Sequence, residues 1–258
     1  MDNEERLSVI LEELKKRRVT SINELSKVCF VSACTLRRDL IKLEQRGLLR
    51  RSYGKVTLLE RGDSISDFDL RKNEVRSAKQ QIAGLAAAMV TDNSLVLMDS
   101  TSTVASLIPF LKEKQKLQIL TNGLKTAGEC GTELPDASVY IIGGMLMRRI
   151  DGTVGLEAIE AMESYRPDIL FFSAKGISIQ DGVQVLNEEG LHVKRSMMRI
   201  SRTKVLLLDS RKFTRSASRV LCPLHDLDYV ITEKDPGEEW RKAFSDAGVK
   251  LIFPGQAE

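Results

Sequence analysis

Residues 21–47 read SINELSKVCFVSACTLRRDLIKLEQRG, and this stretch predicts two helices joined by a tight turn. Ser21 and Glu24 have the spacing of a capping box, in which each side chain caps the backbone N–H of the other residue, so a short helix is expected to begin here. Ser32 is placed to cap a second helix over residues 33–46, and a glycine follows it. Leucines at helical spacing give this second helix one buried face.

The segments before and after this stretch predict one further helix and a hairpin. Apolar residues at helical spacing in residues 7–14 predict a preceding helix, which the basic run KKRR at residues 15–18 closes. After the second helix, residues 47–59 read GLLRRSYGKVTLL and alternate around a Gly-containing turn, which predicts a small basic hairpin. Three helices followed by such a hairpin are typical of a winged helix-turn-helix.

The charge of the chain is unevenly distributed. The first 56 residues contain 13 Lys and Arg against 8 Asp and Glu, a net charge of +5, whereas the remaining residues carry a net charge of −2. A short basic segment beside a nearly neutral one favours binding of a polyanion by the basic part. For KKRR, or for Arg37 and Arg38 taken alone, a solvated helix surface remains the alternative.

The helix-turn-helix order also indicates which residues would meet DNA. In this motif the first residues of the second helix reach base edges in the major groove, while its neighbours and the wing contact phosphates. The candidate DNA-binding residues are Ser32, Ala33, Cys34, Thr35, Arg37, Arg38, Lys42, Arg50, Arg51, Tyr53 and Lys55.

This stretch resembles the DeoR family of bacterial transcriptional regulators. The family pattern is V-S-x-x-T-[IL]-R-R-D-L, followed by L-E-x-x-G and a basic, Gly-rich wing, and residues 31–40 match its first part at every specified position. Leu43-Glu44, Gly47 and Arg50-Arg51 continue the match. Tyr53-Gly54-Lys55 departs from the usual His/Tyr-Gly-Gly of the wing. The resemblance implies binding to operator DNA.

The rest of the chain predicts a second domain. Residues 59–75 are polar with weak periodicity, so we expect a DNA-binding domain at 1–58, a linker at 59–75 and a second domain at 76–258. In the second domain, apolar runs alternate with helical patterns, which predicts an α/β fold with a largely parallel sheet. The expected strands lie near 94–99, 117–121, 138–142, 168–173, 204–209, 228–232 and 249–253.

Small polar residues and lysines follow several of these strands. Ligands of parallel α/β sheets bind beyond the carboxyl ends of the strands, and hydroxyls, backbone N–H groups and lysines suit an anion such as phosphate. Ordinary capping of the next helix is the alternative at any single strand end. The candidate effector-binding residues are Asp99, Ser100, Thr101, Ser102, Thr103, Thr121, Asn122, Gly143, Gly144, Lys175, Gly176, Glu188, Asp209 and Lys212.

The second domain is similar to the effector domain of the same family, which is related in fold to ribose-5-phosphate isomerase and CoA transferases. The motifs T-N-x-L, G-G, K-G-I and D-S-x-K-F occur in the family's order, so the match covers nearly the whole chain. The resemblance implies a repressor of carbohydrate metabolism that binds a phosphorylated sugar or a related metabolite. Thr101 stands where the family often has Gly, and Lys175 where it often has Gly or Asp.

Two other functions fit the second domain. An aldose–ketose isomerase would need a base and a stabiliser for the enediolate, and carboxylates and lysines are available for both. These are Asp99, Glu188, Glu189, Asp209, Lys175, Lys194 and Lys212. Such an enzyme has no need of a basic head, so we expect no catalytic residues. A domain that only oligomerises is the third possibility; a homo-oligomer is expected in any case.

Composition excludes several classes of protein. No apolar run approaches the ~20 residues of a membrane span, and the acidic N-terminus lacks the plan of a signal peptide, so a cytoplasmic location is expected. The four cysteines form no C-x-x-C pair and only two histidines are present, which disfavours a metal site. No cofactor is predicted.

Overall fold

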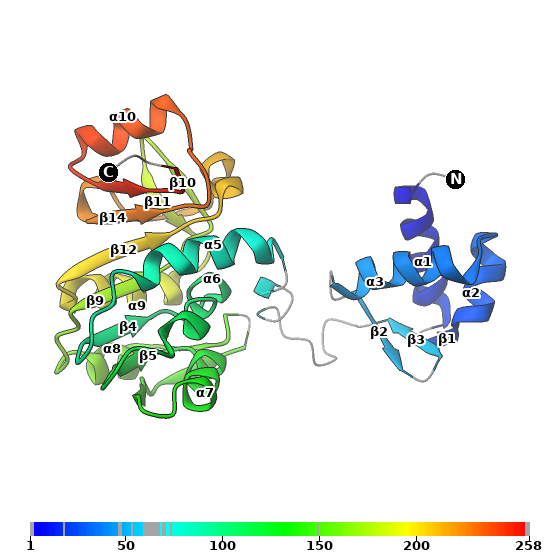
Figure 1. Cartoon of the computed structure of the whole chain (residues 1–258), viewed down its shortest axis with the longest axis horizontal. Helices are drawn as coiled ribbons and strands as arrows, with labels where there is room; N and C mark the ends of the chain where they lie inside the picture. Colours follow the sequence, from blue (N-terminus) through cyan, green and yellow to red (C-terminus); the bar gives the residue numbers. More distant parts are fainter. Residues whose placement is uncertain are drawn as a thin grey trace. The chain divides into compact units, whose positions relative to one another are not determined.

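The computed structural model describes residues 3–17, 19–45, 48–52, 54–58, 68, 71–72, 74–148 and 150–255. The chain forms two compact units, Met1–Glu74 and Val75–Glu258 (Figure 1). Of the residues singled out above, Arg18, Gly47, Tyr53 and most of the expected linker lie outside the described residues.

Within residues 3–58, the described part of the N-terminal unit forms three helices and a three-stranded antiparallel sheet. The elements are α1 (Asn3–Arg17), β1 (Val19–Ser21), α2 (Ile22–Cys29), α3 (Ala33–Gln45), β2 (Leu49–Ser52) and β3 (Lys55–Leu58). The sheet has the order β1-β3-β2, so the predicted hairpin of β2 and β3 is joined by one further strand, which the sequence did not suggest. This is a winged helix-turn-helix, as predicted.

The predicted helix caps are confirmed. Ser21 Oγ accepts a hydrogen bond from the Glu24 N–H at 3.1 Å, and the Glu24 carboxylate accepts one from the Ser21 N–H at 3.0 Å. This backbone hydrogen bond is the main reason that the pKa of Glu24 is lowered to about 2. Ser32 Oγ likewise accepts from the Thr35 N–H at the start of α3. Both helices of the motif therefore start where the sequence predicts.

A single cluster of apolar side chains holds this unit together. It includes residues from all three helices, from β2 and from β3, and Leu36, Leu40 and Leu43 of α3 are fully buried in it. Asp39 is also buried and accepts from Arg6 Nε of α1 at 2.6 Å, so an ion pair adds to the packing of α3 on α1. Burial of one face of α3 leaves its opposite face to solvent.

The C-terminal unit is built on a seven-stranded sheet in which every neighbouring pair is parallel. The order is β15-β14-β12-β9-β4-β5-β6. All seven strands lie within or beside the predicted runs, so the predicted parallel sheet is confirmed. The strands are β4 (Leu95–Met98), β5 (Gln118–Thr121), β6 (Ser138–Ile141), β9 (Ile169–Phe172), β12 (Thr203–Leu207), β14 (Tyr229–Ile231) and β15 (Lys250–Ile252).

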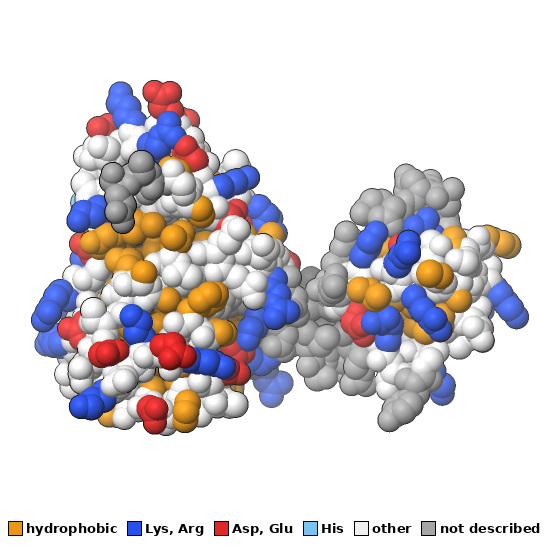
Figure 2. All heavy atoms as spheres, viewed as in Figure 1, with side chains coloured by type: hydrophobic (Ala, Val, Ile, Leu, Met, Phe, Trp, Pro, Cys, Tyr) orange, Lys and Arg blue, Asp and Glu red, His pale blue; other side chains and the backbone are white. Residues whose placement is uncertain are grey.

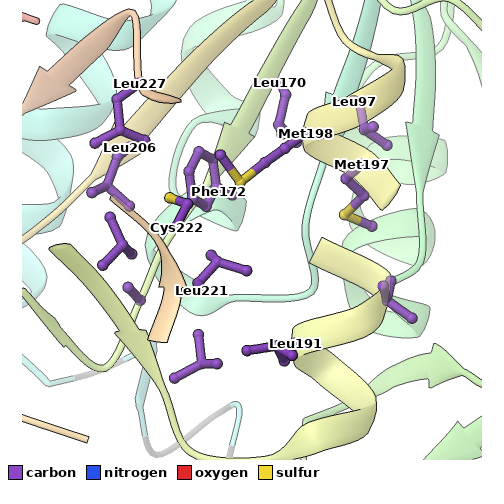
Figure 3. Packing of buried hydrophobic residues seen from close by; sticks show 14 of the residues in the cluster. Leu97, Leu170, Phe172, Leu191, Met197, Met198, Leu206, Leu221, Cys222 and Leu227 are labelled. Carbon is purple, nitrogen blue, oxygen red and sulfur yellow. The ribbon is translucent and has the colours of Figure 1, made fainter. Parts of the chain in front are cut away.

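Helices cover both faces of this sheet (Figure 1). The helices are α5 (Arg76–Ala87), α6 (Ser102–Ala105), α7 (Leu124–Glu133), α8 (Leu156–Met162), α9 (Glu188–Ile200) and α10 (Glu238–Asp246). On one face, Met198 of α9 lies beside Leu170 and Phe172 of β9, and Met197 lies beside Leu97 of β4 (Figure 3). This packing fixes α9, and with it the side chains that α9 directs at the ends of the strands.

Five further strands, outside the parallel sheet, were not predicted. β7 (Met145–Met147) and β8 (Gly152–Val154) form an antiparallel hairpin, and β10 (Gly176–Ser178), β11 (Gly182–Val185) and β13 (Arg219–Cys222) form a three-stranded antiparallel sheet. Both structures follow strands of the large sheet and extend it beyond the carboxyl ends of those strands.

Candidate functional site

The exposed face of α3 carries the residues predicted to meet DNA. Ala33, Cys34, Arg37, Arg38 and Lys42 are all exposed. The face of this unit shown in Figure 2 displays many more Lys and Arg than Asp and Glu side chains. Because the opposite face of α3 is buried in the unit's core, these side chains are held on a rigid helix and point to solvent, as a helix that enters the major groove requires.

Ser32 and Thr35 lie at the first turn of α3 and bond to each other. Their hydroxyl oxygens are 3.0 Å apart, and Ser32 Oγ also caps the helix. Ser32 is exposed and Thr35 half-buried. Their structural role at the cap is therefore established by these contacts, and a contact with DNA stays a prediction.

The basic side chains of the wing, unlike those of α3, are not all exposed. Lys55 is exposed at the start of β3, beside the turn between β2 and β3. Arg51 is half-buried, and its guanidinium lies 2.6 Å from the carboxylate of Glu44 on α3. Lys55 is thus free of any such ion pair in the described contacts, while the charge of Arg51 is partly balanced; the side chain of Arg50 lies outside the described residues.

In the C-terminal unit, Asp99 ties together the ends of two neighbouring strands. Its carboxylate follows β4, is buried, and accepts from the Ser173 N–H after β9 at 2.9 Å and from the Thr101 N–H at 2.8 Å. Lys194 of α9 forms an ion pair with the same carboxylate. The carboxylate therefore has a lysine partner.

A second carboxylate and two more cations lie beside this pair. Lys212 Nζ is 2.8 Å from Ser173 Oγ and 3.9 Å from the carboxylate of Asp209, which follows β12 and is buried. Arg211 donates to Asp209 at 2.8 Å. Since β4, β9 and β12 are adjacent in the sheet, their carboxyl ends bring Asp99, Ser173 and Asp209 into one cluster.

The pKa values in this cluster reflect burial and competing charges. Burial is the largest influence on Lys212 and lowers its pKa to about 8, although the neighbouring Asp209 acts in the opposite direction. For Asp209, burial raises the pKa, but the hydrogen bond from Arg211 and the charge of Lys212 outweigh it, so that the pKa is lowered. At neutral pH the Asp209 carboxylate is therefore charged. Lys212 is mostly charged as well, but it loses its proton near pH 8, well below the pH at which an ordinary lysine does so.

Lys79 is a member of the cluster that the sequence prediction missed. It lies on α5, is buried, and donates from Nζ to Ser102 Oγ at 3.1 Å. A sign of its role is present in the sequence, because Lys79 occupies the same helix face as the buried residues Ile82, Ala83 and Ala86. Lys194 follows the same rule on α9, between Leu191 and Met197, and was considered only as an enzyme residue.

Ser173 was also missed, and only the packing of strands reveals it. Its hydroxyl donates to the Leu207 carbonyl at 2.6 Å and accepts from Lys212, and its N–H reaches Asp99. It thereby connects the ends of β4, β9 and β12 without any charged or motif-forming side chain of its own.

Three buried oxygen atoms near these strand ends have no hydrogen-bond partner within the part of the chain that the structure describes. They are Asn122 Oδ1, Thr126 Oγ1 and Asp209 Oδ2. Buried polar atoms are normally satisfied, so each of these indicates a place for a donor such as a ligand hydroxyl or a water molecule. Asn122 follows β5 and Asp209 follows β12, so both lie at the carboxyl edge of the sheet.

The loop after β5 lies close to the loop after β4. A Cβ on Gly123 would come within 2.9 Å of the Ser100 backbone, so only Gly fits there. Thr121 accepts from the Gly123 N–H, and Ser100, Ser102 and Thr103 are buried. The structure therefore brings the predicted residues of β4 and β5 together.

Five predicted effector residues lie elsewhere or have structural roles. Gly143 is exposed, and Gly144 has a φ of 121°, where an added Cβ would meet the Val154 carbonyl. Gly176 packs so closely on the Arg215 backbone that an added Cβ would lie 2.0 Å from its carbonyl oxygen. Lys175 is exposed, and Glu188 is exposed and ion-paired with Arg219. None of the five has a described contact with the cluster around Asp99 and Asp209.

Comparison with known protein families settles what these two units are. A DeoR-like helix-turn-helix domain matches residues 6–61, and a DeoR C-terminal sensor domain matches residues 74–234. The chain belongs to the DeoR family. It is therefore a DNA-binding transcriptional regulator with a sensor domain.

Individual DeoR-type relatives match over nearly their whole length. The HTH-type transcriptional regulator GolR of Listeria innocua is 29% identical over 247 residues, which cover 96% of this chain and 97% of the relative. The HTH-type transcriptional repressor GlcR of Bacillus subtilis is 28% identical over 258 residues, or 100% and 99% of the two chains.

Two solved structures show more distant similarity. The sorbitol operon regulator SorC from Klebsiella pneumoniae aligns with a TM-score of 0.38 at 10% identity, over 81% of this chain and 90% of that chain. Ribose 5-phosphate isomerase from Plasmodium falciparum aligns with a TM-score of 0.39 at 13% identity, over 53% and 52%.

Thr101 stands where the DeoR pattern often has Gly, and its conformation and hydrogen bonds explain why a side chain is accommodated there. Thr101 has a φ of −89°, which any residue adopts, so its backbone does not require the Gly that is common there. Its hydroxyl donates to Asp99, as does its N–H. Thr101 thus adds a bond to the carboxylate that a Gly could not make. Because α6 is a single turn long, the cations of the cluster, rather than a helix dipole, supply its positive charge.

The described residues offer neither a metal site nor a membrane span. No group of three or more His, Cys, Asp and Glu side chains within this part of the chain could hold a metal ion. No helix in the same residues is long and apolar enough to cross a membrane.

Proposed function

We propose that this DeoR-family regulator represses an operon of carbohydrate metabolism and that a phosphorylated sugar or a related metabolite controls its affinity for operator DNA. Residues 1–58 bind the operator and residues 76–258 bind the effector, with residues 59–75 connecting them. A regulator of this kind acts in the cytoplasm, where the operator is accessible.

The observation that carries the effector proposal is the composition of the cluster. Lys79, Lys194 and Lys212 place ammonium groups, which suit a phosphate, beside strand ends where Asn122 and Asp209 have unsatisfied acceptor atoms. Unsatisfied acceptors suit the hydroxyl groups of a sugar, which donate hydrogen bonds. One ligand that carries both a phosphate and hydroxyls satisfies both kinds of group.

Control of DNA binding requires that the effector distinguish two states of the protein. Two DNA-binding heads must match half-sites about 34 Å apart, or a multiple of that spacing, so a modest change in their separation lowers operator affinity. An effector releases the operator only if it binds the DNA-competent state less tightly than the other state.

A mobility-shift assay with a panel of sugar phosphates tests this proposal. We expect one ligand to lower operator affinity, and we expect Lys212→Ala and Thr101→Val to bind the operator normally but respond weakly to that ligand. Lys175→Ala is the matched control, because this lysine is exposed and outside the cluster. An unchanged operator affinity at saturating ligand across the panel would refute the effector proposal.

A thiol-alkylation experiment tests the DNA-binding face separately. Cys34 is exposed on α3, whereas Cys29, Cys130 and Cys222 are buried. Burial raises the pKa of Cys130 and of Cys222 to about 12, which keeps both thiols unreactive. We therefore expect a maleimide to label Cys34 alone and operator DNA to slow that reaction. Equal labelling rates with and without operator would place Cys34 outside the interface.

We propose no catalytic role for the cluster. The Asp99 carboxylate already accepts hydrogen bonds from two backbone N–H groups and forms an ion pair with Lys194. The pKa of Asp209 is lowered, which makes its carboxylate a weak base. Turnover of a sugar phosphate that is lost in Asp99→Ala would establish the isomerase alternative. If no sugar phosphate raises the thermal stability of the protein, a domain that only oligomerises becomes the better explanation.

A further inference from the structure

The exposed residues of α3 form two rows along the helix. Residues four apart in a helix lie above one another on the same face, so the exposed positions of α3 fall into two sets. One row consists of Ala33, Arg37 and Ile41, and the other of Cys34, Arg38 and Lys42. We name them the Ala33 row and the Cys34 row. Both rows begin at the first turn of α3, the part of such a helix that reaches base edges.

The two rows differ in charge. The Ala33 row has one arginine between two apolar side chains, whereas the Cys34 row has two cations in succession. Ile41 is 40% exposed, so the free protein leaves apolar surface of this row in water. Contacts with phosphates need polar or charged groups, whereas base edges also present apolar groups. The charges therefore favour the Cys34 row beside a phosphate strand and the Ala33 row against the bases.

The other polar side chains of this part of α3 are engaged within the protein. Ser32 Oγ accepts from the Thr35 N–H at 3.2 Å and lies 3.0 Å from the hydroxyl of Thr35. Asp39, the one carboxylate in residues 33–42, is buried and paired with Arg6. These ten residues include no Asn or Gln. The exposed face of α3 therefore has neither the amide that reads adenine nor the carboxylate that reads cytosine.

Apolar side chains in the major groove have one specific counterpart. Of the four bases, only thymine carries a methyl group at the edge of this groove. Contact with Ala33 or Ile41 would remove such a methyl group from water, a gain of about fourfold in affinity for each methyl group. Arg37 lies between these residues on the same row and has the planar fork that fits the O6 and N7 atoms of guanine.

We propose that the Ala33 row determines the operator sequence: Ala33 and Ile41 contact thymine methyl groups, and Arg37 between them binds a guanine. The Cys34 row lies along a phosphate strand. This assignment rests on the proposed binding of operator DNA by residues 1–58. Four residues advance a helix by about 6 Å and base pairs are about 3.4 Å apart, so each thymine is expected about two base pairs from the guanine.

Removal of single methyl groups from the DNA tests the proposal. Selection from a library of random duplexes by the full-length chain supplies the operator, and each of its thymines is then replaced by deoxyuridine, which lacks only the methyl group. We expect deoxyuridine to weaken binding about fourfold at the positions that the Ala33 row contacts. Only the DNA changes, so no variant has to fold. A selected operator that binds equally well with every deoxyuridine substitution would overturn the proposal.

Protein variants assign each methyl contact to a residue. Ala33→Gly and Ile41→Ala should each abolish the loss caused by deoxyuridine at one position, because the apolar contact is gone. Cys34→Ala is the matched control from the other row and should retain the loss at both positions. Any unfolded fraction of a variant lowers its binding to both duplexes equally and cancels in their ratio. Losses that persist in Ala33→Gly and Ile41→Ala, or that disappear in Cys34→Ala, would contradict the assignment.

The two arginines test the orientation of the rows. Arg37→Ala should relax the preference for guanine, whereas Arg38→Ala should keep the base preferences and reduce the salt slope by about one. The reverse result would place the Cys34 row against the bases and refute the proposal. If the selection enriches no sequence, the proposed operator binding fails and this assignment fails with it. An enriched operator without methyl dependence refutes the assignment alone.

Discussion

Lys212 is held between two opposing influences. Burial favours its neutral form, and the nearby carboxylate of Asp209 favours its charged form, with the balance at a pKa of about 8. A phosphate bound beside it adds a second negative charge and so stabilises the ammonium. Binding above pH 8 therefore takes up a proton, and this linkage can be measured.

We expect the affinity for a sugar phosphate to fall as the pH rises through 8. The ligand's phosphate is already largely a dianion above pH 7, so the change comes from the protein. A lysine with a pKa of 8 is about 90% charged at pH 7 and about 10% charged at pH 9, which predicts a loss of about tenfold in affinity over this range. Isothermal titration at several pH values measures it.

Lys212→Arg provides the control, because a guanidinium stays charged throughout this range. Its affinity should be nearly independent of pH. An equally steep loss of affinity in this variant would show that another group is responsible.

Arg37 and Arg38 are adjacent and both exposed, yet they need not do the same work. Substitution of an arginine that reads a base should cost about 1–3 kcal/mol and relax specificity at one position of the operator, whereas loss of a phosphate contact should reduce the salt slope by about one. Arg37→Ala and Arg38→Ala, measured against operator and point-substituted operators at several salt concentrations, separate these roles. An arginine whose variant binds normally in every assay is not in the interface.

At the scale of elements, the turn between α2 and α3 is strained. Phe30 caps α2 with a φ of 52°, in the left-handed region, and its side chain is 94% exposed. The conformation is unfavourable for a residue with a Cβ, and Gly is the usual residue at such a position. The side chain gains little from burial in return.

Phe30→Gly should therefore stabilise the N-terminal unit by about 1 kcal/mol. Phe30→Ala keeps a Cβ in the same conformation and should have little effect, so the comparison isolates the backbone strain. Chemical denaturation of the full chain measures both. A stability gain of the same size in Phe30→Ala would attribute the effect to the exposed aromatic ring instead.

The elements also show where prediction from the sequence succeeds. Central strands of the parallel sheet such as β4 and β9 are buried on both faces, so each is a continuous apolar run that stands out from its surroundings. The helix caps are local patterns and were placed correctly. β7, β8, β10, β11 and β13 lie outside the parallel sheet in small antiparallel sheets, and tertiary pairing rather than local sequence determines them.

Some residues of the candidate site could likewise be predicted from the sequence, and others could not. Asp99 and Asp209 lie at the carboxyl ends of predicted strands, so the sequence indicates the edge of the sheet that they occupy, and the strand order β12-β9-β4 of the structure brings them near each other. Lys79 and Lys194 come from the middle of helices, and only the packing of α5 and α9 on the sheet brings them to the strand ends. Lys175 was predicted from its position after β9, but the chain turns there and leaves it in solvent.

At the scale of the whole molecule, the two units have separate apolar cores. Separate cores predict separate cooperative unfolding. We expect calorimetry to show two transitions, with operator DNA raising the temperature of one and an effector raising that of the other, because a ligand stabilises the unit that binds it. A single transition that both ligands shift equally would show that the units unfold together.

Lys79 connects the cluster to the start of the C-terminal unit over a short stretch of chain. Its ammonium reaches Ser102 among the strand ends, and its backbone N–H donates to the carbonyl of Val75, the first residue of the C-terminal unit. The first turn of α5 is therefore all that separates this lysine from the segment that leads back to the DNA-binding unit. If Lys79 binds the effector as proposed, a shift of its side chain has to pass along only one helical turn to reach the start of the C-terminal unit.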